Sequence, residues 1–259
     1  MTRGTQRRAT ILTYHSIGQC PTPGPHRCLC ISPASFTAQM EFLARHRQVV
    51  SLEALVDGRL MPGRPAVAIT FDDGYRNILT NAAPILLQYG FVATVFVPTR
   101  WVGGDNRWDA GNHCYPLEIM GESELRDAER YGISVESHGH SHIDLERAEP
   151  LLVADDLRIS VLRLSEILGR RPRYLAYPYG RQSAQARTAA RAAGFSDAFL
   201  VDHPDAGPFR RERISMDGYE GRIRLQTKTA GGYLQRRRST LGKLAASLVR
   251  VVAPRPDGA

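Results

Sequence analysis

Two adjacent aspartates, Asp72 and Asp73, follow an apolar run in the segment AITFDDGY, residues 68–75. The preceding residues AITF favour a β-strand, so the two acids stand where that strand would end. An acidic surface turn is the simpler interpretation, because Asp and Gly are common turn residues. The alternative is a metal site, and the rest of the sequence has to decide between them.

Three histidines lie close together in the segment SHGHSHIDL, residues 137–145. In a helical turn, His138 and His142 would share one face and His140 would point away, which is how two imidazoles usually grip one metal ion. In an extended segment all three would share a face. Gly139 leaves both conformations open, and we favour the helical turn. Two imidazoles and one carboxylate would leave metal positions open for water and substrate, as catalytic sites require.

β-Favouring runs alternate with segments of helical periodicity along most of the chain. Strands are expected at residues 9–14, 67–71, 92–98, 133–137, 174–178 and 197–201. Helices are expected at residues 33–46, with Ser32 as a cap, and at 77–90, 122–130, 149–168 and 183–193. This alternation predicts parallel strands wrapped by helices, as an open sheet or a barrel.

Polar residues follow four of these strands. They are His15, the Asp72–Asp73 pair, the histidine cluster and Tyr179. The carboxyl ends of parallel strands meet at one face, where the reactive residues of α/β proteins gather. This convergence favours a functional site over unrelated surface turns.

The composition indicates a folded protein, because 42% of the 259 residues are hydrophobic. The 34 Lys and Arg residues against 26 Asp and Glu give a formal net charge of +8, which favours anionic partners without naming one. We expect no nucleic-acid partner. The four cysteines fit neither a disulfide framework nor a zinc knuckle, so reduced thiols are expected. They are Cys20, Cys28, Cys30 and Cys114.

The ends of the chain differ from its middle in composition. Residues 1–8 are expected to be a flexible basic segment, residues 9–235 one α/β domain, and residues 236–259 a basic amphipathic helix and tail. The tail fits a membrane-surface helix or a helix packed on the barrel, and we favour packing. The N-terminus lacks the long apolar core of a signal peptide, and no apolar run approaches the roughly 20 residues that span a bilayer. A cytoplasmic location is therefore expected.

The motifs TFDDG at 70–74, H-x-x-x-H at 138–142 and YPYG at 177–180 together resemble the polysaccharide deacetylases with a NodB homology domain, carbohydrate esterase family 4. The resemblance spans roughly residues 9–217. The segments FTAQMEFL, ATVFVP and RIS look most like the subgroup that modifies bacterial exopolysaccharides. The family fold is an irregular (β/α) barrel with seven strands, which agrees with the alternation described above.

The resemblance implies a metal-dependent hydrolase that removes acetyl groups from N-acetylhexosamine units of a poly- or oligosaccharide. It implies Asp73, His138 and His142 as metal ligands and Asp72 as general base. Tyr179, through its backbone N–H, and Pro178 would contact the substrate. The implied cofactor is one divalent ion, with Zn²⁺ first and Co²⁺, Ni²⁺ and Fe²⁺ as alternatives that accept the same ligands.

The sequence departs from the usual family pattern at the group that protonates the leaving amine. A late Leu-x-His motif normally supplies this acid, but no histidine occurs after His203. His15, at the end of the first expected strand, is the alternative. This implies a permuted motif order, in which the usual closing strand of the barrel has become the opening one.

Two further departures concern supporting residues. Ala176 stands where the family often has the arginine that holds the catalytic aspartate, and either Arg173 or Arg213 could replace that arginine. Gly139 stands where a Ser or Thr is frequent, which removes a hydroxyl beside the histidines. These gaps keep open an inactive glycan-binding module of the same fold. A non-haem iron oxygenase is a further alternative, although the missing H-x-D spacing argues against it.

Overall fold

The computed structural model describes residues 9–19, 29–112, 116–202, 207–218, 220–231 and 233. Seven parallel strands form a closed barrel in a single domain. They are β1 (Ala9–Tyr14), β5 (Ala66–Phe71), β6 (Ala93–Val97), β7 (Ile133–Ser137), β8 (Tyr174–Ala176), β9 (Asp197–Val201) and β10 (Arg211–Ser215). Short strand β4 (Gln48–Val49) extends the sheet beside β5, while β2 (Ser16–Ile17) and β3 (Cys30–Ile31) form a separate pair. The predicted (β/α) barrel is confirmed.

Strand β1 closes the barrel between the last strand and β5. Its residues pair in parallel register with β5 from Ala9 opposite Ala66 to Tyr14 opposite Phe71. On its other side, Leu12 lies opposite Ile214 of β10. The first and last strands are therefore neighbours, as closure of the barrel requires, and this makes a permuted motif order possible.

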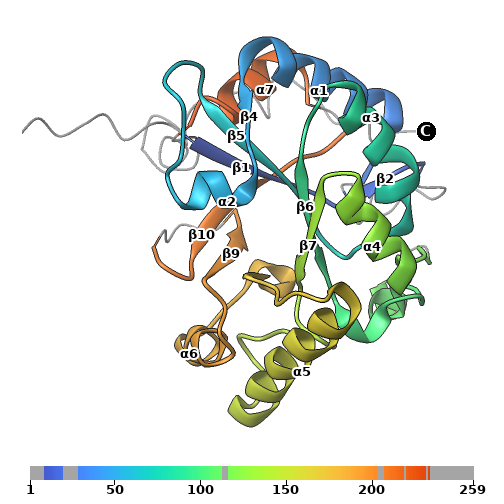
Figure 1. Ribbon diagram of the computed structural model, residues 1–259, viewed down its shortest axis with the longest axis vertical. Helices are drawn as coiled ribbons and strands as arrows, with labels where there is room; N and C mark the ends of the chain where they lie inside the picture. The colour runs from blue at the N-terminus through green and yellow to red at the C-terminus, as the bar shows by residue number, and fades with distance from the viewer. Residues whose placement is uncertain are drawn as a thin grey trace, which may run out of the picture.

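Helices cover the outside of the barrel, and Figure 1 shows α1, α3, α4 and α5 along one side of the strands. The α-helices are α1 (Pro33–His46), α2 (Leu52–Val56), α3 (Ala83–Gln88), α4 (Glu122–Arg130), α5 (Pro150–Leu168), α6 (Ala184–Ala192) and α7 (Arg222–Lys228). The Ser32 hydroxyl accepts the Ser35 N–H at 3.1 Å, so the predicted N-cap of α1 is present.

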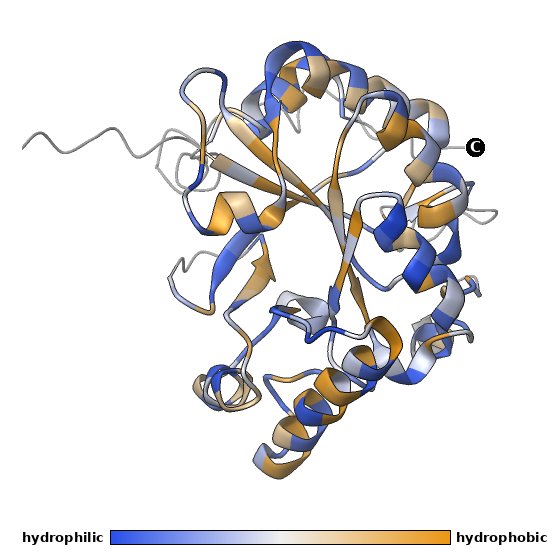
Figure 2. Ribbon diagram, in the orientation of Figure 1, coloured by the Kyte–Doolittle hydropathy of each residue, from blue (hydrophilic) through white to orange (hydrophobic). Residues whose placement is uncertain are grey.

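The strands are buried on both faces, which explains their nearly continuous apolar sequences. All six residues of β5 are buried. Figure 2 shows hydrophobic residues along the strands in the middle of the molecule. The Asp72–Asp73 pair and the histidine cluster follow directly on the ends of β5 and β7, where the turns begin.

Two local predictions differ from the structure. The helix expected at 77–90 consists of a π-helix (Ile78–Ala82) followed by α3. Pro84 accounts for the wider turn, because it has no N–H to donate to the carbonyl four residues earlier and its ring crowds that carbonyl. The helical turn favoured for 137–142 is also wrong, since the chain leaves β7 as an irregular loop.

Other features were not anticipated. Strand β10 and helix α7 went unpredicted, and Cys30 is disulfide-bonded, so the expectation of reduced thiols is wrong for this residue. Among the residues that the structure describes, no helix has the length and apolar character needed to cross a bilayer. The predicted basic N-terminal segment, residues 1–8, and the amphipathic tail, residues 236–259, lie outside the described residues.

Candidate active site

The turn after β5 buries both aspartates. Asp72 and Asp73 are only 2% and 4% exposed. The Asp72 N–H donates to the Tyr14 carbonyl at 2.9 Å, and the chain then turns through left-handed φ angles of 68° at both Asp73 and Gly74. A Cβ at Gly74 would lie 3.0 Å from a methyl group of Val97, so a side chain has no room there. Such burial contradicts the acidic surface turn.

The three predicted metal ligands come together around one point. The Asp73 Oδ1 atom lies 3.5 Å from His138 Nε2 and 3.2 Å from His142 Nε2. All three ligand atoms lie within 4.8 Å of one another. Ligands about 2.1 Å from a tetrahedral zinc ion are about 3.4 Å apart, so these atoms fit around one cation. Because all three residues are buried, an unpaired charge on the Asp73 carboxylate would be costly, and a bound cation would offset it.

His138 is held in the orientation that a metal ligand needs. Its Nδ1 lies 2.8 Å from the Ala176 carbonyl, so Nδ1 carries the proton and the Nε2 lone pair faces Asp73. Burial lowers the pKa of His138 to about 4. The imidazole is therefore neutral near neutral pH and available to a metal ion.

His142 is held by aromatic rings instead. Its ring stacks on Trp108, with centroids 4.6 Å apart, and contacts the Tyr179 ring edge-on at 4.8 Å. Within the described residues, its buried Nδ1 atom has no hydrogen-bond partner. The conformation of His142 is unusual as well, with a φ of 58°. Packing rather than a second hydrogen bond therefore orients this imidazole.

Asp73 has a support that the sequence did not reveal. The buried Tyr75 hydroxyl hydrogen-bonds to Asp73, and Asn106 hydrogen-bonds to the same hydroxyl. Asn106 also accepts the Leu117 N–H at 2.8 Å. Burial alone would raise the pKa of Asp73, but the hydrogen bond and charge of His142 outweigh it, and the net pKa is well below the usual value. The carboxylate is therefore ionised.

Asp72 pairs with a buried arginine. The Arg213 guanidinium donates to both carboxylate oxygens of Asp72, at 2.6 and 2.8 Å, and is 0% exposed. The Phe96 ring packs against this guanidinium at 5.0 Å. Burial would raise the pKa of Asp72, but the charge of Arg213 outweighs it and keeps the pKa lowered. Of the two predicted alternatives, Arg213 is the partner, whereas Arg173 binds Glu53 at 2.6 Å.

His15 directly follows β1, and its electrostatic interaction is among the influences that lower the pKa of Asp72 and of Asp73, which places it near both aspartates. Its neighbours in the chain are tied down on both sides. Before it, the Tyr14 carbonyl accepts the Asp72 N–H. After it, Ser16 and Ile17 both hydrogen-bond to the Asn77 side chain. The predicted catalytic acid therefore belongs to the same cluster of strand ends.

Two asparagines that sequence reasoning missed hold the chain after His15. Asn77 accepts the Ile17 N–H at 3.2 Å and donates to the Ser16 hydroxyl at 2.8 Å. Asn81 donates to the Ile17 carbonyl at 2.7 Å. Both asparagines lie at or within the π-helical turn, so this turn holds the chain beside His15.

Tyr179 and Pro178 occupy the turn after β8, a 3₁₀ segment (Pro178–Gly180). Tyr179 has a φ of 59° and a side chain that is 49% exposed, while Pro178 is buried. The ring of Tyr179 therefore forms an open rim beside His142. Asp73, His142 and Tyr179 are three of the five described non-glycine residues with positive φ, and such strained residues cluster at active sites.

Comparison with known sequences supports one family. A family model described as polysaccharide deacetylase matches residues 60–198. The chain is 26% identical over 212 residues to a poly-beta-1,6-N-acetyl-D-glucosamine N-deacetylase of Staphylococcus aureus, covering 75% of this chain and 71% of that protein. It is 27% identical over 189 residues to YxkH of Bacillus subtilis, covering 71% of this chain but only 61% of that protein, less than two thirds of its length.

Solved structures show the same fold. The deacetylase PplD of Streptococcus pyogenes, in complex with acetate, superposes with a TM-score of 0.69 at 21% identity, covering 86% of this chain and 98% of that chain. IcaB from Ammonifex degensii superposes with a TM-score of 0.71 at 21% identity, covering 88% and 97%. Together with the family model, which spans more than half of the residues, these matches show that the chain belongs to the polysaccharide deacetylase family.

Proposed function

We propose that this protein is a metal-dependent deacetylase that hydrolyses the acetamide of N-acetylhexosamine units in a poly- or oligosaccharide. The observation that carries the proposal is the division of labour between the two aspartates. Asp73 lies against His138 and His142, while Asp72 lies against Arg213. One carboxylate can therefore join the imidazoles around a cation, and the other stays free of that cluster for proton transfer.

Asp73, His138 and His142 would hold one divalent cation, with zinc as the first choice and cobalt, nickel and iron as alternatives. Such a cation supplies Lewis-acid chemistry, acidifying water and polarising the acetamide carbonyl. The neutral state of His138 and the ionised state of Asp73 are the protonation states that binding needs.

Asp72 acts as the general base, and Arg213 aims it. Water adds to the acetyl carbon, and Asp72 accepts the proton that the water gives up. The lowered pKa makes Asp72 a weak base, so it depends on water already acidified within the site. The two hydrogen bonds from Arg213 fix the carboxylate plane and remove the need to reorient it during the reaction.

His15 and Tyr179 complete the reaction. The backbone N–H of Tyr179 donates to the oxygen that becomes negatively charged when water adds. His15, in its protonated form, gives a proton to the sugar nitrogen as the C–N bond breaks. The products are acetate and the free amine. Tyr179, with its exposed ring at the rim, and Pro178 line the path of the incoming sugar.

The substrate class follows from the relatives and from the open rim. The S. aureus relative is named for poly-β-1,6-N-acetyl-D-glucosamine, and the net charge of +8 also suits an anionic glycan or carrier. The exposed Tyr179 ring leaves the surface beside His142 open, which suits one unit of a longer chain. We place polymeric and oligomeric N-acetylhexosamine first.

Acetate release from a panel of N-acetylated polysaccharides, oligosaccharides and monosaccharides tests this proposal. We expect release by the metal-loaded protein, loss of release after chelation, and recovery when zinc or cobalt is added back. Asp73→Asn should abolish release, and Asp155→Asn, which changes an exposed acid on α5, should not. Glycan binding without acetate release would favour the inactive module, and a requirement for dioxygen would favour the oxygenase.

A further inference from the structure

We propose that Asp156, on helix α5, is a positioning residue for the metal ligands. It fixes the loop that joins His138 to His142, and Gly139 is the residue that leaves room for it. The inference rests on the proposed metal-dependent function. It assigns a role to a buried acid that touches neither the ligand atoms nor the proposed substrate path.

Asp156 binds the loop through its backbone. One carboxylate oxygen accepts the His140 N–H at 2.7 Å, and the other accepts the Ser141 N–H at 2.8 Å. The side chain is buried, with 3% of Asp156 exposed. Successive N–H groups that converge on one anion form a stable concave arrangement, and here a carboxylate of the same chain fills it.

A second residue of α5 supports the preceding N–H group. The Gly139 N–H donates to the Ser137 hydroxyl at 3.1 Å, and that hydroxyl lies 2.9 Å from the Ser160 hydroxyl. Asp156 and Ser160 are four residues apart, so both project from one face of α5. Asp156 therefore satisfies two N–H groups of the loop, and Ser137, supported by Ser160, satisfies the one before them.

The opposite side of the loop is held by the segment that follows β6. Thr99 and Arg100 donate their N–H groups to the carbonyls of Gly139 and His140, at 3.2 and 2.9 Å. The His140 ring lies against the Thr99 hydroxyl, 2.8 Å from its Nδ1. His140 is thereby turned away from the metal cluster. The loop is clamped between two elements, and His138 and His142 are left facing Asp73.

Gly139 and Asp156 depend on each other. A Cβ at position 139 would lie 2.8 Å from the Asp156 Oδ2 atom, closer than real contacts allow, and the φ of +75° also favours glycine. A side chain at 139 and a carboxylate at 156 therefore exclude one another. This explains why the frequent hydroxyl residue is missing from this position, because the acid from α5 now satisfies the loop.

The Asp156 carboxylate also bears on electrostatics. In the part of the chain that the structure describes, no Lys or Arg forms a salt bridge with it. Its hydrogen-bond partners are the backbone N–H groups of His140 and Ser141. A buried negative charge behind the histidine loop favours a bound cation over an empty cluster.

Zinc affinity of the metal-stripped full chain, measured by competition with a chromophoric chelator, tests the inference. Asp156→Asn retains the size of the side chain but turns one acceptor into a donor facing an N–H group. We expect it to weaken zinc binding by about 10- to 100-fold, the usual effect of losing a residue that orients metal ligands. Asp155→Asn, one residue away and exposed with an ion pair to Arg158, is the matched control and should bind zinc like wild type.

The reciprocal variant at Gly139 gives an independent measurement. Gly139→Ala should weaken zinc binding about tenfold in the wild-type background but much less in Asp156→Ala, because the clash is then gone and only the strained φ remains. Melting of the metal-free variants by circular dichroism shows whether each is folded. If Asp156→Asn does not fold, Gly139→Ala and Asp156→Glu, which keeps the charge but displaces the oxygens, carry the test.

The outcomes separate this inference from the proposed function. Folded Asp156→Asn that binds zinc like wild type, or Gly139→Ala equally harmful in both backgrounds, would overturn the positioning role whatever the enzyme does. Wild-type protein that binds zinc but releases no acetate would overturn the deacetylase while leaving the Asp156 measurement valid. Wild-type protein that binds none of zinc, cobalt, nickel and iron would overturn both.

Discussion

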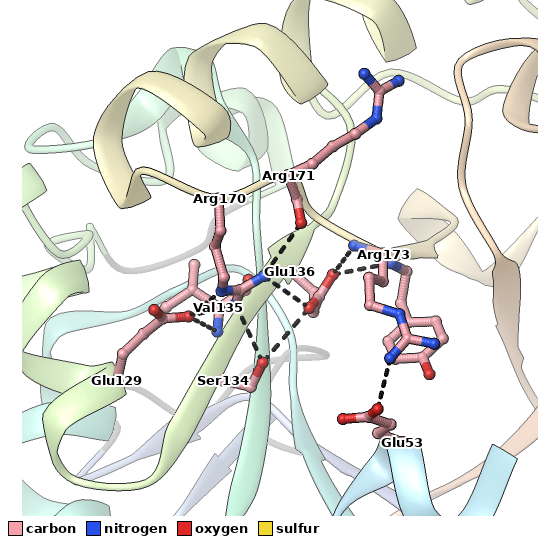
Figure 3. A network of polar contacts seen from close by, with 9 residues as sticks. Glu53, Glu129, Ser134, Val135, Glu136, Arg170, Arg171 and Arg173 are labelled. Carbon is pink, nitrogen blue, oxygen red and sulfur yellow. Dashed lines mark hydrogen bonds and ion pairs between the residues drawn. The ribbon is translucent and has the colours of Figure 1, made fainter. Parts of the chain in front are cut away.

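Two buried carboxylates, Asp72 after β5 and Glu136 on β7, are held in opposite ways. Asp72 receives both of its hydrogen bonds from one fully buried side chain, that of Arg213. Glu136 accepts the backbone N–H groups of Arg173 and Tyr174 at 2.6 and 2.8 Å, with Arg170 further away at 3.3 Å. Figure 3 shows Glu136 within this second network, beside Glu129 and Arg170.

The position of Glu136 explains its partners. Strands β7 and β8 pair only at Ser137 and Leu175, so the N–H groups at the start of β8 have no strand partner there. The Glu136 carboxylate takes that place and stabilises the barrel. Burial is the largest influence and raises the pKa of Glu136, whereas the charge of Arg213 lowers the pKa of Asp72. One acid supports the fold, while the other is kept ionised beside the candidate metal site.

The largest expected difference between these two acids is in catalysis. Asp72→Asn should reduce the turnover of acetate release by about 10³-fold, within the range of general-base contributions. Glu136→Gln should leave turnover per folded molecule within about threefold of wild type, because its carboxylate binds Arg170 and the N–H groups of Arg173 and Tyr174 rather than a residue of the proposed site. Steady-state kinetics on both variants measures this. Equal losses would show that the two carboxylates do not have separate roles.

The stability of the fold, in contrast, should depend on Glu136. Glu136→Gln removes an acceptor from two backbone N–H groups and an ion-pair partner from Arg170, so we expect the free energy of unfolding to fall by about 2–3 kcal/mol. Urea denaturation followed by circular dichroism measures this loss. Glu129→Gln, which breaks only the half-exposed part of the same network with Arg170, is the matched control and should cost less than about 1 kcal/mol. A loss no larger than that of the control would contradict the role assigned to Glu136.

A smaller loss of turnover is expected from a change at Asn77, which holds the chain beside His15 without touching the substrate. Asn77→Ala removes the bonds to Ser16 and Ile17, so the chain beside His15 loses one of its two anchors. We expect turnover to fall about tenfold, as misplacement of a catalytic group costs. Zinc affinity should not change. Asn81→Ala, with one bond to the same segment, should show a weaker form of the same effect. Loss of zinc binding in Asn77→Ala would mean that the whole turn had collapsed.

Much of the barrel and the core of the site could be predicted from sequence, because both depend on short-range patterns. Apolar runs separated by helical periodicity gave the strands, and polar residues just beyond them gave Asp73, His138 and His142. His138 and His142 would share a face in either a helical or an extended segment, so the wrong local conformation did not change the choice of these two histidines.

What the sequence could not reveal depends on contacts between distant elements. Arg213 and Arg173 were equal alternatives until the register of β10 placed Arg213 against Asp72. Asp156 stands in a helix beside the similar but exposed Asp155, and only the packing of α5 on the histidine loop distinguishes them. Strand β10 itself carries charged residues that hide its β-strand character.

The smallest expected effect is on the pH dependence of stability, and it distinguishes Asp72 from Glu136 most directly. The pKa of Asp72 is lowered from 3.8, so its stabilising contribution is present above that value and is lost as the pH falls through the folded-state pKa. The pKa of Glu136 is raised from 4.5, so its contribution is fully present below that value and is lost as the pH rises through the folded-state pKa.

The unfolding free energies of wild type, Asp72→Asn and Glu136→Gln are measured from about pH 3 to about pH 7. The difference between wild type and each variant should change with pH, with opposite signs for the two variants and by at most about 1.4 kcal/mol per pH unit. The difference between wild type and Asp72→Asn should shrink as the solution becomes more acidic. The difference between wild type and Glu136→Gln should shrink as it becomes more alkaline. Opposite signs require that the charge of Arg213 outweighs burial in setting the pKa of Asp72, and that burial outweighs hydrogen bonding in setting the pKa of Glu136. Slopes of the same sign would therefore mean that burial and ion pairing shift the pKa of both acids in the same direction.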